Sequence, residues 1–178
     1  MSTPELPVEA GGPIRPPSGV LERLTGAIAI LGGLLALAVA VLATTSVLMR
    51  WLLNAPIDGD FEYVKMATAV AVFAYLPYTQ ARRGNIMVDT FTGWLSARAR
   101  NVMDAFWDLV FAGFMGFCAL ALIVGTFDYI RSGETTMQRQ LLLWPSIAVA
   151  TLFCAILSIV AVATAIRLLR APTNGERK

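Results

Sequence analysis

The sequence predicts an all-α integral membrane protein with four transmembrane helices and a short amphipathic helix in the membrane interface between helices two and three. Hydrophobic residues make up 57% of the 178 residues and charged residues only 15%. Soluble domains are closer to half apolar and a quarter charged. The apolar residues are also concentrated in four long segments, which is typical of a chain that crosses a bilayer repeatedly.

The four predicted spans form one transmembrane domain, residues 20–170, between two polar tails. They cover about residues 24–50, 61–81, 103–130 and 141–167. Residues 1–19 contain five prolines and almost no apolar periodicity, so we expect a disordered cytoplasmic tail. Residues 171–178 form a second cytoplasmic tail. The acidic residues near the start and the long first apolar run favour an uncleaved first helix over a signal peptide.

The first span has no charged residue from position 24 to 49, and Arg50 and Trp51 mark its end. These positions reach roughly 39 Å as a helix, enough to cross a hydrocarbon core of about 30 Å. Small residues repeat at every fourth position on one face: Gly32, Ala36, Ala40 and Thr44. Such a stripe lets a neighbouring helix approach closely, and alanine-rich helices also show it by chance.

The second span follows a connection rich in turn-forming residues, in which Asp60 is a natural N-cap. Between Lys65 and Arg82 only 16 residues are uncharged. That is roughly 24 Å, slightly short of a span, so Lys65 must extend toward the interface or turn to a partner. Glu62 lies three residues before Lys65, which favours a mutual ion pair, and a contact with a partner subunit is the alternative.

The second span ends at Arg82, Arg83 and Gly84. Residues 85–95 then carry apolar and aromatic side chains that fit a short helix in the interface. The third span carries Asp104 and Asp108 near its start. A carboxylate there can belong to an ion path, but pairing with a basic residue of the preceding loop is favoured because Asp108 lies at the edge of the span.

The fourth span opens with Trp144 and Pro145, where a proline does least harm to a helix. It carries a second stripe of small residues at fourfold spacing: Ser146, Ala150, Cys154 and Ser158. We expect Ala150 and Cys154 to face another helix. Both cysteines of the chain lie in apolar segments and are interpreted as small buried residues.

Several classes of function are disfavoured by composition. Histidine is absent, which removes the commonest ligand of haem, zinc and copper and the usual general base near neutral pH. The stretch from Asp58 to Phe91, around which the chain is organised, has no evident nucleophile, metal-ligand set or phosphate-binding loop. A net charge of +2 is too small to indicate nucleic-acid binding. We therefore expect neither an enzyme nor a bound cofactor or metal.

The Lys and Arg residues predict the topology. With both termini in the cytoplasm, ten basic residues lie inside: Arg15, Arg23, Arg82, Arg83, Arg98, Arg100, Arg167, Arg170, Arg177 and Lys178. Four lie outside: Arg50, Lys65, Arg131 and Arg139.

The order of these features resembles a known family. The motifs are V-L-M-R-W ending the first span, G-D-F-E-Y-V-K opening the second, and Y-T-Q-A-R-R-G-N-I-M-V-D-T-F after it. Together they resemble the small membrane subunit of tripartite ATP-independent periplasmic (TRAP) transporters, over about residues 20–170. The chain departs from the family pattern at Asn85, where histidine is frequent, and at Phe61, where tryptophan is frequent.

The resemblance implies partners and a function. A large membrane subunit would carry the substrate and sodium sites, and a periplasmic binding protein would deliver an organic acid. The small subunit would brace the large one among the lipids of the bacterial inner membrane. The alternatives are a small independent channel or exporter acting as a homo-oligomer, and a membrane enzyme or redox anchor.

The residues expected to matter for structure and assembly lie at the ends of the second span and on the stripe of the fourth. They are Arg50, Glu62, Lys65, Arg82, Arg83, Gly84, Asp89, Ala150 and Cys154.

Overall fold

The computed structural model describes residues 20–82 and 97–170, which form four helices. These are α1 (Val20–Leu53), α2 (Asp60–Ala81), α3 (Ala97–Ser132) and α4 (Trp144–Arg170). Apart from one isolated antiparallel bridge between Thr135 and Leu142, the described part contains no β-structure. The all-α prediction is therefore confirmed for that part. The two predicted tails and the predicted interfacial helix lie outside the described residues.

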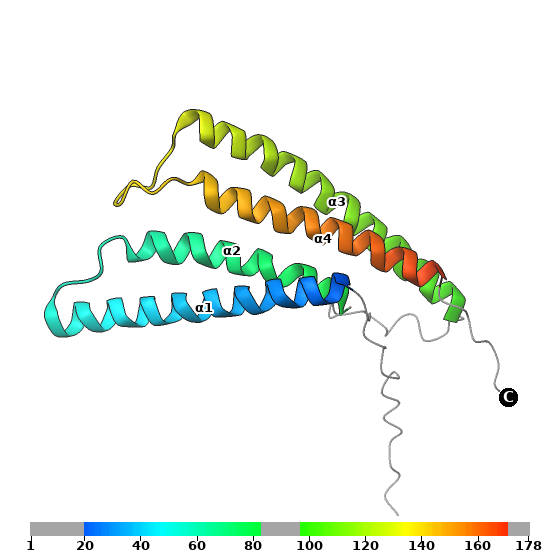
Figure 1. The fold of residues 1–178 in the computed structure, drawn as a ribbon, viewed down its shortest axis with the longest axis horizontal. Coiled ribbons are helices and arrows are strands. Elements are labelled where there is room, and N and C mark those ends of the chain that lie inside the picture. The colour runs from blue at the N-terminus through cyan, green and yellow to red at the C-terminus, as the bar shows by residue number, and fades with distance from the viewer. Residues whose placement is uncertain (1–19, 83–96, 171–178) are drawn as a thin grey trace, which may run out of the picture.

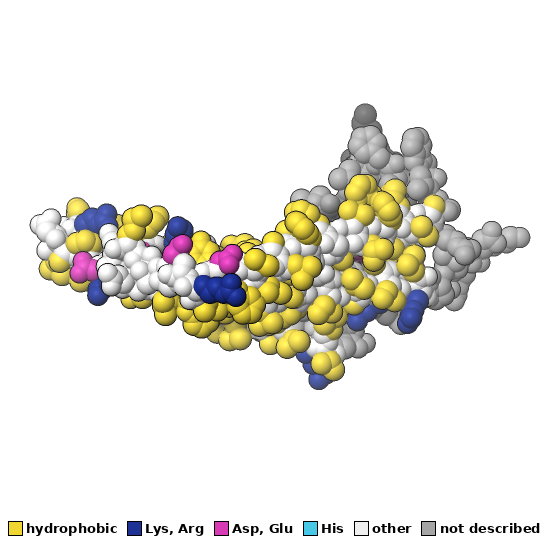
Figure 2. All heavy atoms as spheres, turned by 90° about the horizontal axis from the view of Figure 1, so that it is seen from above, with side chains coloured by type: hydrophobic (Ala, Val, Ile, Leu, Met, Phe, Trp, Pro, Cys, Tyr) yellow, Lys and Arg dark blue, Asp and Glu magenta, His cyan; other side chains and the backbone are white. Residues whose placement is uncertain are grey.

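The four helices lie side by side in one layer, in the spatial order α1, α2, α4, α3 (Figure 1). α1 packs on α2, α2 on α4, and α4 on α3, so α2 and α4 are the central pair. A single layer leaves both faces of each helix open. Large apolar side chains are exposed on all four helices, and hydrophobic side chains spread over much of the surface in Figure 2. Such a surface is suited to lipid or to another membrane protein.

Among the described residues, three helices are long and apolar enough to cross a membrane. They are α1, the Asn101–Ser132 part of α3, and α4. α2 has 22 residues but is not among them. Three of the four predicted spans thus correspond to helices that could cross a membrane, and the span of α2 stays a prediction.

The contact between α1 and α2 depends on small residues spaced by multiples of seven. Thr25, Gly32 and Ser46 are the buried residues of α1, and a seven-residue repeat keeps one seam facing a neighbouring helix. At Gly32 the two helices approach closely, since a Cβ there would lie 2.9 Å from the Cβ of Ala74 on α2. Of the fourfold stripe predicted on the first span, only Gly32 is buried within this chain.

The contact between α3 and α4 is also built from small residues. Ala105, Ala112 and Ala119 of α3 are buried at sevenfold spacing. On α4, the Oγ of Ser158 donates to the carbonyl of Ala112 at 2.9 Å, and the Sγ of Cys154 donates to the carbonyl of Met115 at 3.4 Å. Backbone carbonyls within reach of short side chains indicate a close approach of the two helices.

Candidate functional site

The two ends of α2 carry the polar contacts that join the helices of the layer. At its start, α2 contacts the end of α1 and the connection between α3 and α4, residues 133–143. We call this the loop end of the layer. At the opposite end, α2 contacts the start of α1 and the first part of α3. Each of these contacts involves a charged side chain.

α2 begins at a glycine in the left-handed region of backbone space. Gly59 has a φ of 76° and is the N-cap residue, with no side-chain capping bond. The prediction that Asp60 caps the helix is therefore wrong. Glycine is suited to this conformation because a Cβ would be strained there. Asp60 is instead the first helical residue, and its carboxylate is free to reach α1.

Asp60 joins α2 to α1 at the loop end. The Ser46 hydroxyl and the backbone N–H of Phe61 both donate to its carboxylate. The Nη2 of Arg50 lies 3.8 Å from the Asp60 carboxylate, in an ion pair whose Arg50 side chain is exposed. The Ser46 hydrogen bond is the main cause that holds the pKa of Asp60 below its usual range, with the Phe61 hydrogen bond and the Arg50 charge adding to it. The carboxylate is therefore ionised at neutral pH.

Glu62 holds the connection between α3 and α4. Its Oε2 accepts a hydrogen bond from the Thr136 hydroxyl at 2.7 Å and from the Arg139 backbone N–H at 3.0 Å. Its Oε1 accepts from the Gln138 backbone N–H at 2.7 Å. Glu62 is only 8% exposed. The predicted ion pair between Glu62 and Lys65 is not formed, because the carboxylate turns to the connection while Lys65 is exposed.

The connection itself is shaped to present these donors. The Thr136 N–H donates to the Leu141 carbonyl at 2.9 Å, and the Leu141 N–H donates back to the Thr136 hydroxyl at 3.0 Å. Residues 137–139 form the turn between them, and Gln140 has a φ of 54°. The turn thus aims its backbone amides inward at Glu62. In Figure 1 this connection reaches toward the start of α2.

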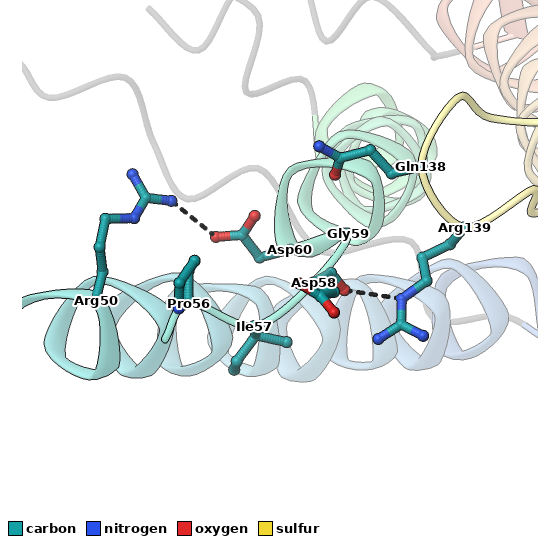
Figure 3. A pocket seen from close by; sticks show the side chains of 8 residues that line it. All are labelled: Arg50, Pro56, Ile57, Asp58, Gly59, Asp60, Gln138 and Arg139. Carbon is teal, nitrogen blue, oxygen red and sulfur yellow. Dashed lines mark hydrogen bonds and ion pairs between the residues drawn. The ribbon is translucent and has the colours of Figure 1, made fainter. Parts of the chain in front are cut away.

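The side chain of Arg139 packs against the residues that precede α2. Its Nε donates to the Asp58 carbonyl at 3.1 Å, and a Cβ on Gly59 would overlap its side chain. Figure 3 shows Arg139 pointing to Asp58, while Arg50 faces Asp60 on the other side of the α1–α2 turn. Together with neighbouring residues, these side chains line an open hollow of about 420 Å³.

The opposite end of α2 is fixed in the same manner. The Nη2 of Arg82 lies 3.1 Å from the Oε1 of Glu22 at the start of α1, and its guanidinium lies 5.3 Å from the Tyr78 ring centre. Gln80, which is 2% exposed, donates from Nε2 to the Oδ1 of Asp108 on α3 at 2.9 Å. Polar contacts therefore hold both the start and the end of α2 to α1 on one side and to α3 or the α3–α4 connection on the other.

Some of the predicted site residues take part in these contacts and others do not. Arg50, Glu62 and Arg82 all take part in them. Ala150 and Cys154 are buried, 7% and 1% exposed. Lys65 is exposed on α2. Arg83, Gly84 and Asp89 lie outside the described residues.

Sequence reasoning did not predict four contributors to these contacts: Glu22, Ser46, Gln80 and Thr136. Ser46 shares the seven-residue spacing of Thr25 and Gly32, and this repeat was a signal that could have been used. Gln80 lies in the last turn of the predicted second span, and a polar side chain there is expected to have a hydrogen-bonding partner. Nothing in the sequence connects Thr136 with Glu62.

The described residues offer structural contacts rather than a reaction centre. They include no group of three His, Cys, Asp or Glu side chains close enough to hold a metal ion. The charged side chains in these contacts lie near the two ends of α2, on both sides of the layer's apolar middle.

A family model matches most of the chain. It describes the DctQ component of tripartite ATP-independent periplasmic transporters, and it matches residues 39–171. The chain belongs to this family. The match runs from the middle of α1 past the end of α4, so it covers the whole of α2. No curated protein and no solved structure matches the chain.

Membership identifies the chain as the small component of a TRAP transporter, and the resemblance drawn from its motifs is confirmed. Together with the three long apolar helices, it indicates a multi-pass membrane protein that works with other transporter components.

Proposed function

We propose that this DctQ component is a non-catalytic scaffold for the large, sodium-coupled membrane subunit of its transporter. The complex takes up an organic acid that a periplasmic binding protein delivers. The large subunit carries the substrate and ion sites and moves during transport. The small subunit provides a fixed frame against which that movement occurs.

The observation that carries this proposal is the fixation of α2 at both ends. Asp60 and Glu62 hold its start, and Gln80 and Arg82 hold its end. Hydrogen bonds to charged groups are among the stronger polar contacts in proteins. A central helix held in this way resists sliding along its axis and keeps the layer rigid, which suits a brace.

The length of α2 and its packing between α1 and α4 support α2 as a fourth membrane span. Its 22 residues reach roughly 33 Å as a helix, enough for a hydrocarbon core of about 30 Å. Its neighbours α1 and α4 are both apolar enough to cross a membrane. A helix that packs between two spanning helices along its length lies at the same depth.

An inner-membrane location suits a component of a periplasmic transporter, and the Lys and Arg residues support an orientation of the chain in that membrane. The loop end carries four basic residues, Arg50, Lys65, Arg131 and Arg139. Six basic residues of the described segments lie at the opposite end: Arg23, Arg82, Arg98, Arg100, Arg167 and Arg170. The positive-inside rule therefore puts the loop end in the periplasm and both termini in the cytoplasm.

Reconstitution in liposomes tests the proposal. The substrate is the acid that the companion binding protein retains on purification. This chain alone, with an inward sodium gradient, is expected to give no uptake. Addition of the large subunit and the loaded binding protein is expected to give sodium-dependent uptake. Uptake by this chain alone would instead support the alternative of an independent channel or exporter.

A further inference from the structure

α2 is a central helix with two open sides, and one of them carries Lys65. Lys65 is exposed, and so are the residues that share its side of the helix: Phe61, Thr68, Ala69 and Val72. They stand at positions i−4, i+3, i+4 and i+7 relative to Lys65, which lie together on one side of an α-helix. We call these five residues the Lys65 face.

The other open side of α2 has a different character. There, Tyr63, Met66, Ala67 and Val70 line an apolar groove together with residues of α1, α4 and the connection before α4. None of the lining residues is charged. This side is suited to the hydrocarbon tails of lipids, whereas the Lys65 face presents an ammonium group.

The nearest carboxylates of the same chain are already engaged. Glu62 accepts hydrogen bonds from the connection between α3 and α4, and Asp60 accepts them from Ser46 and Phe61. A lysine inside a membrane helix is costly unless it finds a partner or reaches the interface. Lys65 lies five residues after the start of α2, roughly 7.5 Å along the helix axis.

We propose that the Lys65 face is the surface on which a membrane helix of the large transporter subunit packs, with a carboxylate of that helix paired to Lys65. The inference rests on the proposed function, which supplies the partner. Charge complementarity selects the carboxylate, because the exposed cation is the one charge among the five residues of this face. The small side chains of Thr68 and Ala69 allow the incoming helix to approach closely.

Site-specific photo-cross-linking in membranes that contain the whole transporter tests the position of the partner. A photoreactive residue at Val72 is expected to cross-link to the large subunit. The same residue at Val70, in the groove on the other side of α2, is the matched control and is expected to react with lipid. If the complex is recovered but Val72 reacts only with lipid or with a second copy of this chain, the inference is wrong and the proposed function stands.

Substitution of Lys65 tests the charge pair. Lys65→Glu and Lys65→Met are each expected to lower the amount of large subunit that co-purifies by about tenfold, as for loss of a desolvated charge pair, while Lys65→Arg retains most of it. Recoveries are normalised to the amount of this chain in the membrane. If Lys65 only extends to the interface, Lys65→Met leaves recovery unchanged, and that result would overturn the inference. Failure of the unaltered chain to co-purify with any large subunit would instead overturn the proposed function.

Discussion

A single carboxylate orders a connection that lies far from it in the sequence. Glu62 accepts hydrogen bonds from the turn that follows α3, more than seventy residues along the chain. Two of the three donors are backbone N–H groups, so substitution within the turn leaves them in place. The side chain of Glu62 is therefore the element whose loss would release the turn.

Replacement of Glu62 should loosen this connection selectively. In Glu62→Ala the backbone amides of Gln138 and Arg139 lose their acceptor, so we expect their hydrogen exchange to rise by about tenfold or more, since local opening sets the exchange rate. Hydrogen exchange followed by mass spectrometry in detergent measures this. Glu134→Ala, an exposed carboxylate of the same connection, is the matched control. Equal exchange in the two variants would show that Glu62 does not hold the turn.

The sequence indicated Glu62 but not its partner. Its position near a helix start and its charge marked it as significant, and Lys65 was visible three residues away. Pairs at this spacing are evident from sequence, whereas Thr136 becomes a neighbour only through the fold. The predicted cap at Asp60 failed for a similar reason, because Ser46 and Arg50 draw that carboxylate toward α1.

At the scale of the elements, helix contacts in this layer depend on residues without bulky side chains. Gly32 lies against Ala74, and the buried alanines of α3 lie against α4. Lipid tails are as apolar as leucine, so close packing rather than exclusion from water stabilises these contacts. An added methyl group at such a point must separate two helices.

Gly32→Ala should therefore destabilise the protein. Its new Cβ would lie within 2.9 Å of the Ala74 Cβ, and overpacking of this kind costs about 1–3 kcal/mol. Thermal unfolding in detergent measures the change. The control is Gly113→Ala, where nothing lies within 4 Å of the new Cβ. There the better helix propensity of alanine should stabilise by about 0.5–1 kcal/mol. A Gly32→Ala variant as stable as the Gly113→Ala variant would contradict the packing described for α1 and α2.

The sequence predicted the helices better than their contacts. The apolar segments placed α1, α3 and α4 because a bilayer requires long uncharged runs. The fourfold stripes were only partly correct, since Ala40 and Thr44 are exposed while Cys154 and Ser158 do contact α3. An alanine-rich helix carries small residues on several faces, and the sequence does not say which face meets a neighbour.

At the scale of the whole molecule, the single layer was not predictable from the sequence. In a membrane, residues that face lipid are as apolar as residues that face another helix, so polarity does not separate inside from outside. α4 is as central as α2, yet it is one of the three helices apolar enough to cross a membrane, so the apolar content of a helix did not indicate its place in the layer. A layer that exposes both faces of its central helices is suited to act as one part of a larger assembly.

The central claim is that this chain is one component of a larger membrane complex rather than a self-contained transporter. Native mass spectrometry of the tagged chain, purified in mild detergent from cells that also express the large subunit and the binding protein, tests it most directly. The account predicts a particle that contains both this chain and the large subunit. A particle built only from copies of this chain, with the large subunit purifying separately, would contradict it.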